Sequence, residues 1–173
     1  MTTQLQPTAE AVADLLVRMC QEPWPTTEQD RRDYFATLGL TDQELLPIHE
    51  DDADDVWRRF TTALPGQVGG NCSTFRSEFL GLSLFCWTEQ VDNGLHARTG
   101  YATLQQLLNQ EFGAPIEEWG TDSEPACLWT VGPLTLEMYC FQRLHSSVMV
   151  GPSHTIRSAA NDAAHQDHPD NGP

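Results

Sequence analysis

Carboxylates form the densest group of chemically active side chains in this chain. Seven of them lie between positions 42 and 55, with no lysine or arginine among them. Closely spaced carboxylates can bind a hard cation, complement the positive end of a helix dipole, or attract a cationic protein. The residues are Asp42, Glu44, Glu50, Asp51, Asp52, Asp54 and Asp55.

Two interpretations of this acidic cluster remain open. In the first, the acids occupy the first turn of a helix over residues 52–63 and pair with Arg58 and Arg59, four residues further on. In the second, the cluster is a docking surface that speeds association with a cationic partner. A calcium site has less support, because the central glycine and distal glutamate of an EF-hand loop are missing.

No residue pattern indicates an enzyme or a metal centre. Ser83 lies in the stretch Gly81–Phe85, which lacks the second glycine of a G-x-S-x-G nucleophile elbow. The six histidines include no H-E-x-x-H pair, and His165 and His168 lie in a polar segment that would not preform a site. We therefore predict no catalytic residue, no metal and no cofactor.

The basic residues exclude further functions. The chain of 173 residues has 25 acidic and nine basic side chains, for a formal charge of −16, and all nine basic residues are arginines. Without lysine there is no P-loop, no pyridoxal Schiff base and no protein-kinase lysine. The negative charge disfavours a nucleic-acid partner and favours a basic protein surface.

Composition also suggests a compartment. Residues 1–10 show no secretory signal, and no apolar stretch approaches the ~20 residues of a membrane span, so we expect a cytoplasmic protein without a membrane partner. The five cysteines form no C-x-x-C pair and are odd in number. We expect them to be reduced and mostly buried.

Apolar spacing predicts the secondary structure. Helices are expected over residues 8–22 and 26–39, opened by Thr8 and by Thr26 or Thr27, followed by a helical turn from Thr41 and the helix over 52–63. A further helix is expected over residues 99–112. Strands are expected over residues 72–79, 80–89, 126–131, 134–142 and 146–152, the last three as an antiparallel meander.

These elements predict one α+β domain over residues 1–157, helical over 8–63 and strand-rich over 70–157. We expect N-terminal helices and an antiparallel sheet of about five strands, with the 99–112 helix packed on one face. Residues 158–173 lack large apolar side chains and are predicted to be a disordered tail.

Five tryptophans divide into two groups. Trp57, Trp87 and Trp129 lie in predicted helix stripes or strands and are expected in the core. Trp24 lies between two prolines and Trp119 follows two glutamates, so both are expected to be partly exposed. Exposed tryptophans often anchor protein interfaces, so we add these two to the candidate partner-binding residues.

Six short segments carry a family resemblance. They are Glu22–Asp30, Phe35–Leu40, Tyr101–Leu104, Phe112–Pro115, Leu128–Gly132 and Ser146–Gly151. Together they resemble small acidic proteins of high-GC bacteria that are grouped with immunity proteins of polymorphic toxin systems. The resemblance covers about half of the chain and rests on helix ends, turns and strand tryptophans.

The resemblance implies a non-enzymatic cytoplasmic protein that binds and neutralises a cognate secreted toxin. It implies an acidic surface placed against a basic toxin surface, and it transfers no catalytic residue. Two alternatives remain: a secretion chaperone for an effector protein, and an enzyme acting on a small substrate. The oligomeric state, monomer or dimer, stays open.

Overall fold

The computed structural model describes residues 5–45, 55–89, 94–142 and 145–166. Within them lie four helices and one antiparallel sheet of eight strands, so the predicted α+β class is confirmed while the predicted five strands were too few. The helices are α1 (Ala9–Gln21), α2 (Glu28–Leu38), α3 (Leu95–Phe112) and α4 (Thr155–Gln166). The strands are β1 (Leu40–Leu45), β2 (Asp55–Thr62), β3 (Gly69–Phe75), β4 (Glu78–Glu89), β5 (Glu117–Gly120), β6 (Pro125–Val131), β7 (Leu134–Phe141) and β8 (Ser146–His154).

Helices α1 and α2 begin and end where the sequence places their caps. The Thr8 hydroxyl accepts a hydrogen bond from the Ala11 amide at the start of α1. Thr27 and Asp30 form a reciprocal capping box at the start of α2, and Gly39 ends that helix with a φ of 69°. The predicted 99–112 helix is also present, as α3, and begins four residues earlier.

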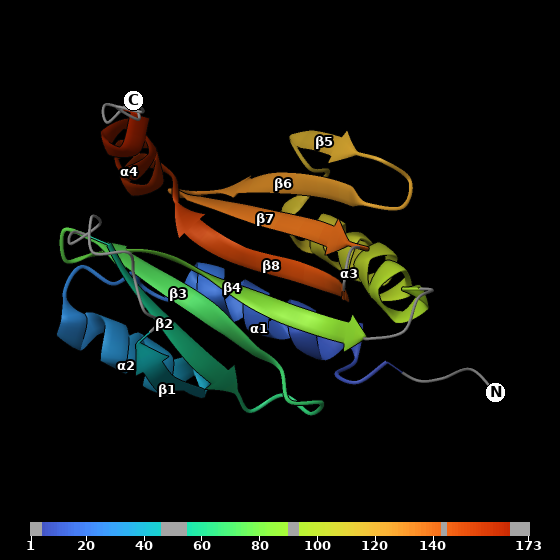
Figure 1. Ribbon diagram of the computed structural model, residues 1–173, viewed down its shortest axis with the longest axis horizontal. Coiled ribbons are helices and arrows are strands. Elements are labelled where there is room, and N and C mark those ends of the chain that lie inside the picture. The colour runs from blue at the N-terminus through green and yellow to red at the C-terminus, as the bar shows by residue number, and fades with distance from the viewer. Residues whose placement is uncertain (1–4, 46–54, 90–93, 143–144, 167–173) are drawn as a thin grey trace, which may run out of the picture.

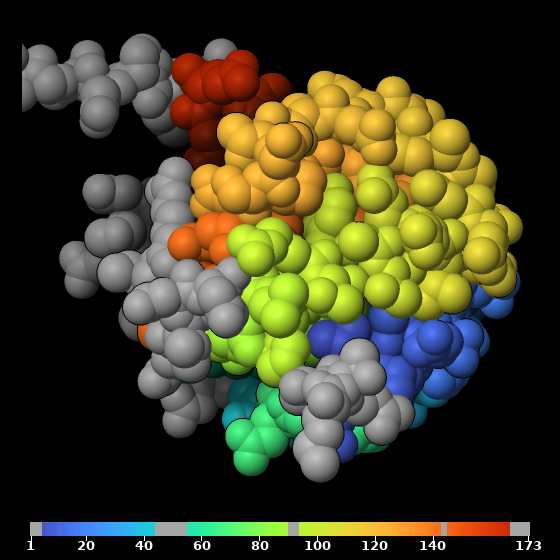
Figure 2. Space-filling view, turned by 90° about the vertical axis from the view of Figure 1, so that its right-hand side faces the viewer, coloured from blue at the N-terminus to red at the C-terminus, as the bar shows by residue number. Residues whose placement is uncertain are grey.

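The sheet consists of two four-stranded meanders joined along one seam. Its strand order is β1-β2-β3-β4-β8-β7-β6-β5, so the last strand of each meander pairs with the other in antiparallel orientation. One or two helices precede each meander, and α1 packs against α3 on the same side of the sheet (Figure 1). Figure 2 shows α3 along the flank of the molecule, between α1 and the β5–β6 region. The arrangement is thus repeated although no sequence repeat is evident.

Two predicted helical segments are strands instead. The turn expected from Thr41 belongs to β1, and the described part of the 52–63 segment forms β2. In β2 the buried Phe60 faces the helices while Trp57 and Arg59 point to the opposite side, which is the two-residue period of a strand. Pairing with β1 and β3 outweighs the helical spacing of Val56, Trp57 and Phe60.

The C-terminal segment is more ordered than predicted. Residues 158–166 of the expected tail belong to α4, whereas residues 167–173 lie outside the described part of the chain. The helix begins directly after β8, where the Arg157 amide donates to Nδ1 of His154. Alanine, which has the highest helix propensity, supplies four of its residues (159, 160, 163 and 164) and offsets the lack of large apolar side chains.

The core lies between the helices and the sheet. Trp129 is 1% exposed, and its indole Nε1 donates to Oδ1 of Asn109 and to the carbonyl of Gly113. Trp87 is also buried, so two of the three predicted core tryptophans are confirmed. The third, Trp57, is 43% exposed, because β2 turns it away from the helices.

A β-bulge turns Trp87 toward the helices. Its φ is 53°, in the left-handed region that a bulky residue rarely adopts, and the β4–β8 register shifts between Cys86 and Glu89. The indole Nε1 donates to the carbonyl of Pro7 at 2.8 Å. The ring lies against Gly100 of α3 so closely that a Cβ there would approach its Cε3 to 2.2 Å.

All five cysteines are free, as expected, and four of them are buried. Burial raises the pKa of the Cys86 thiol to about 12, which keeps it protonated and unreactive near neutral pH. Among the described residues, no helix combines the length and apolar character needed to cross a membrane.

Candidate partner-binding face

The side of the sheet turned away from α1, α2 and α3 is the open face. Figure 1 views the molecule from this side, with those three helices behind the strands and α4 beside one end of the sheet. Strand alternation places polar and aromatic side chains on the open face and apolar ones beneath it. In β7, Glu137, Tyr139 and Phe141 are half-buried on the open face, while Leu136 and Met138 are fully buried.

An aromatic cluster lies toward the β5 edge of the open face. Trp119 is 39% exposed and its ring meets Tyr139 edge-on, with centroids 5.5 Å apart. The Tyr139 ring stacks on Phe141 at 5.9 Å and an interplanar angle of 8°. Both contacts orient large side chains on a face that no helix covers at this edge.

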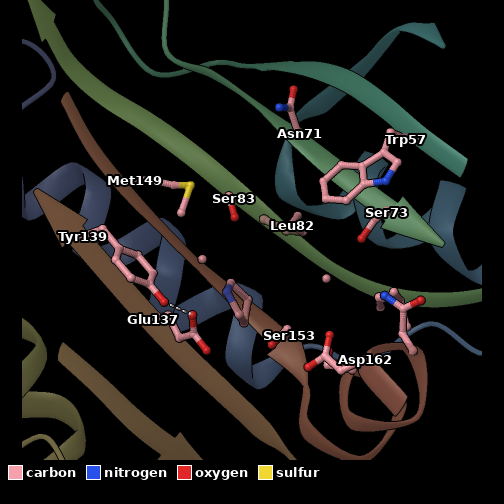
Figure 3. Close-up of a pocket in the computed structure, with 16 residues that line it drawn as sticks. Trp57, Asn71, Ser73, Leu82, Ser83, Glu137, Tyr139, Met149, Ser153 and Asp162 are labelled. Atoms are coloured by element: carbon pink, nitrogen blue, oxygen red, sulfur yellow. Dashed lines mark hydrogen bonds between the residues drawn. The ribbon is translucent and has the colours of Figure 1, made fainter. Parts of the chain in front are cut away.

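A hollow of about 290 Å³ lies between this cluster and Trp57 of β2. Figure 3 shows Trp57 and Asp162 on one side, Glu137 and Tyr139 on the other, and Ser83 between them. The strand register explains the depression, because small residues from three adjacent strands meet at its floor. These residues are Ser73, Gly81, Ser83, Gly151 and Ser153.

The glycines of the floor permit close contact between β4 and β8. A Cβ at Gly151 would lie 1.9 Å from the Leu82 carbonyl oxygen, and a Cβ at Gly81 would lie 2.8 Å from the Ser153 Cβ. Neither position has room for a side chain. The floor of the hollow is therefore built into the central strand pair.

The hollow is acidic. The Tyr139 hydroxyl donates to Oε2 of Glu137 at 2.6 Å, and burial together with this bond raises the pKa of Tyr139. Asp162 contributes a second carboxylate from α4. Among the described residues, neither an arginine nor a histidine lines the hollow, so both carboxylates face it without a cation.

Polar contacts hold α4 beside the hollow. Arg157 donates from Nη1 to the carbonyls of Pro25 and Phe79 at 2.8 and 3.0 Å. Near the other end, His165 Nε2 lies 2.9 Å from Oδ2 of Asp55. None of the α4 residues is buried, so these polar contacts at both ends, more than apolar packing, position Asp162.

The acidic cluster predicted from the sequence divides in the structure. Asp42 binds Arg31 at 2.9 Å, and Asp55 is 8% exposed and bound to His165, so neither carboxylate is free to meet a partner. Glu44 belongs to β1, but its side chain lies outside what the structure describes. The other four acids, Glu50, Asp51, Asp52 and Asp54, also lie outside the described residues.

The two candidate tryptophans lie on different parts of the molecule. Trp24 packs against Phe79 and Tyr34 and donates from Nε1 to the Phe79 carbonyl at 3.3 Å, so it is partly buried against the core. Trp119 belongs to β5, at the edge of the open face. The structure therefore brings Trp119 together with Tyr139, and not with Trp24.

Sequence reasoning missed Trp57, Glu137, Tyr139 and Asp162 as neighbours in one site. The alternation Leu134-Thr-Leu-Glu-Met-Tyr-Cys-Phe141 was a usable signal, since it separates a buried face from a polar and aromatic one. Trp57 was missed because it was assigned to a helix and expected in the core. Asp162 was missed because its segment was predicted to be a disordered tail.

The open face combines exposed aromatic rings with carboxylates, a set that suits recognition of a partner. No group of three or more metal-ligating side chains occurs among the residues that the structure describes. Comparisons with protein-family models, curated proteins and solved structures found no match to the chain, so the geometry of this face carries the functional argument.

Proposed function

We propose that this protein is a non-enzymatic, cytoplasmic immunity protein that binds and neutralises a cognate secreted toxin. Its binding surface is the open face, and the toxin presents a basic surface to it. The observation that carries the proposal is the pairing of two exposed tryptophans, Trp57 and Trp119, with carboxylates on the sheet face turned away from α1, α2 and α3. Exposed aromatic anchors of this kind dominate the binding energy of many protein interfaces.

The size of the open face supports a protein partner. The eight strands are separated by seven spacings of about 4.8 Å and average about eight residues, so the sheet measures roughly 34 by 25 Å. This is close to the ~800 Å² that each partner contributes to a standard interface. A partner of ordinary domain size is able to cover the face in one contact.

The charge of the protein supports a basic partner. The formal charge is −16, and the open face carries Glu117, Glu137 and Asp162 against Arg59. Such a field speeds the encounter with a cationic surface and repels the phosphate backbone of nucleic acids.

The direct test is co-purification with a secreted toxin encoded by a neighbouring gene. We expect the purified pair to form a stable complex in which the toxin is inactive. Replacing Trp57 and Trp119 by alanine should each weaken binding by about tenfold or more. The matched control is Ile116→Ala, since Ile116 is 67% exposed but precedes β5 and is not part of the aromatic cluster. Equal losses in all three variants would argue against the open face.

The residues of the acidic cluster without a described partner remain part of the proposal. We expect joint replacement of Asp51, Asp52 and Asp54 by asparagine to slow association and to flatten its dependence on salt, with little change in dissociation. Asp55 is kept, because it holds His165 in the fold. Stopped-flow association rates measured from low to high salt provide the test, and unchanged rates would remove the cluster from the interface.

A further inference from the structure

We propose that the hollow of the open face is a receptor for an arginine side chain of the protein partner. The inference rests on the proposed function and makes it more specific, because it names the chemical group that anchors the partner. It follows from the shape of the hollow, from its aromatic wall and from its unbalanced negative charge.

The shape fits a single long side chain. Trp57 on β2 and Glu137 on β7 are separated by four strand spacings, about 19 Å between backbones. Their own side chains extend over part of that distance, and serines and glycines fill the floor between them. The remaining cavity of about 290 Å³ is larger than one guanidinium group and too small for a folded element.

The walls match the two properties that distinguish arginine. A guanidinium group is planar and stacks on aromatic faces, and the half-exposed Trp57 ring offers such a face. It also carries five N–H donors, and the hollow offers acceptors on opposite sides in the carboxylates of Glu137 and Asp162. The ammonium group of lysine is a compact point charge and uses the planar wall less well.

Other ligand classes fit the hollow less well. The described lining has two carboxylates and neither an arginine nor a histidine, which opposes a phosphate or another anion. The two carboxylates of the described lining, Glu137 and Asp162, only accept hydrogen bonds when ionised. They therefore favour a ligand that only donates hydrogen bonds, which is the character of arginine.

The test uses the full-length ¹⁵N-labelled protein and Nα-acetyl-L-arginine amide as the probe. The five indole N–H signals are followed by NMR, and the signal of Trp57 is assigned with Trp57→Phe. We expect a saturable shift of the Trp57 signal at millimolar probe, with little change at Trp119. The neutral isostere Nα-acetyl-L-citrulline amide should produce no saturable shift, and the lysine analogue should bind about fivefold more weakly or worse.

Three variants locate the binding group. Glu137→Gln combined with Asp162→Asn should lower the affinity for the arginine probe by about tenfold or more, because both carboxylates are lost. Ser83→Leu should abolish the shift by filling the floor. Glu117→Gln, a carboxylate of the same face outside the hollow, is the matched control and should leave the affinity unchanged. Dispersed spectra of each variant verify that it is folded.

Several results would overturn the inference. It fails if citrulline amide shifts Trp57 as strongly as the arginine probe, if the Trp119 signal responds in place of Trp57, or if the double carboxylate variant binds the probe normally. It also fails if the shift does not saturate.

The receptor and the proposed function fail in different ways. If the toxin binds with unchanged affinity to the Glu137→Gln, Asp162→Asn variant, the arginine receptor is wrong while the immunity function stands. If the probe binds as expected but the neighbouring toxin does not form a complex, the receptor stands and the proposed function is wrong. Competition between probe and toxin would support both.

Discussion

Arg31 binds Asp42, one of the carboxylates that the sequence placed in the candidate partner-binding cluster. Its guanidinium is 1% exposed, and it donates to both oxygens of Glu28 and to both oxygens of Asp42. The group also lies 4.8 Å from the centroid of the Phe35 ring. Asp42 therefore joins α2 to β1, a role that the spacing of acids along the chain does not reveal.

Replacing Asp42 by alanine should lower the free energy of unfolding by about 1–3 kcal/mol, because it leaves a buried guanidinium with half of its acceptors. Urea denaturation at pH 7 measures the change. Asp33→Ala is the matched control, since Asp33 is an exposed acid of α2, the helix that carries Arg31, and its described hydrogen bond is with Gln29. It should change the free energy by less than about 0.5 kcal/mol. Equal losses would contradict the buried role of Arg31.

The lowered pKa of Glu28 should make the free energy of unfolding depend on pH in the acid range. Its hydrogen bonds from Arg31 hold its pKa below the ordinary value. The carboxylate form is thus favoured in the folded state, so its stabilisation is complete above about pH 4.3 and is lost as the pH falls through the lowered folded pKa. Unfolding free energies measured from pH 7 to pH 3 should decline in the wild type.

The decline should be smaller in Arg31→Met, because the donor to Glu28 is gone. Part of it should remain, since hydrogen bonds from Thr26 and Thr27 also lower the pKa of Asp30. An identical slope in both proteins would show that Glu28 does not contribute to the acid response.

The contact between α3 and β4 sets the position of a whole helix. Gly100 is the point where α3 meets the Trp87 ring, and a Cβ there would lie 2.2 Å from the ring. Glycine normally costs a helix about 1 kcal/mol relative to alanine, so Gly100→Ala would be stabilising on an isolated helix. In this fold we expect the opposite, a loss of about 1–3 kcal/mol from overpacking.

Thermal or urea unfolding of Gly100→Ala measures the sign, and a double-mutant cycle identifies the cause. In a Trp87→Leu background the obstructing ring is absent. There the same substitution should be neutral or stabilising. A loss of similar size in both backgrounds would attribute the effect to something other than the indole.

Helices and strands that are marked by nearby caps, stops or turns could be predicted from the sequence. Strands whose conformation depends on pairing with distant strands could not. α1, α2 and the β6–β7–β8 meander were predicted because caps, glycine stops and the Gly132-Pro133 turn act within a few residues. β1 was mistaken for a helical turn because Thr41 and Glu44 have the spacing of a capping box. β2 was mistaken for a helix because its apolar residues also fit helical spacing. Pairing with β1 and β3 decides that Phe60 is buried and Trp57 exposed.

The candidate site was predicted in part for the same reason. Trp119 could be identified as exposed from its acidic neighbours, and it does lie on the open face. Glu137 and Asp162 both line the hollow for two reasons. β8 pairs with β7, which carries Glu137, and β8 leads directly into α4, which carries Asp162. No spacing along the sequence indicates that Glu137 and Asp162 are neighbours. The partner-binding residues were therefore predicted in the acidic cluster between positions 42 and 55 instead.

The charge of the whole molecule should act on its stability. With a formal charge of −16, folding brings like charges together, and this repulsion is screened by salt. We expect the melting temperature at pH 7 to rise by a few degrees, on the order of 2–5 °C, between dilute buffer and 0.3 M sodium chloride. The rise should shrink at pH 5, closer to the isoelectric point of about 4.4. A melting temperature independent of salt would contradict the repulsion.

The seam between β4 and β8 also bears on how the chain avoids aggregation. β4 is the longest strand and is largely apolar, and one of its edges pairs only with β8. During synthesis β8 emerges after α3 and three further strands. Until then, the edge of β4 that will pair with β8 stays unpaired. A long apolar edge is a template for pairing with other chains. The second meander therefore acts as a built-in cover for the first, and any fragment that ends before β8 is expected to self-associate.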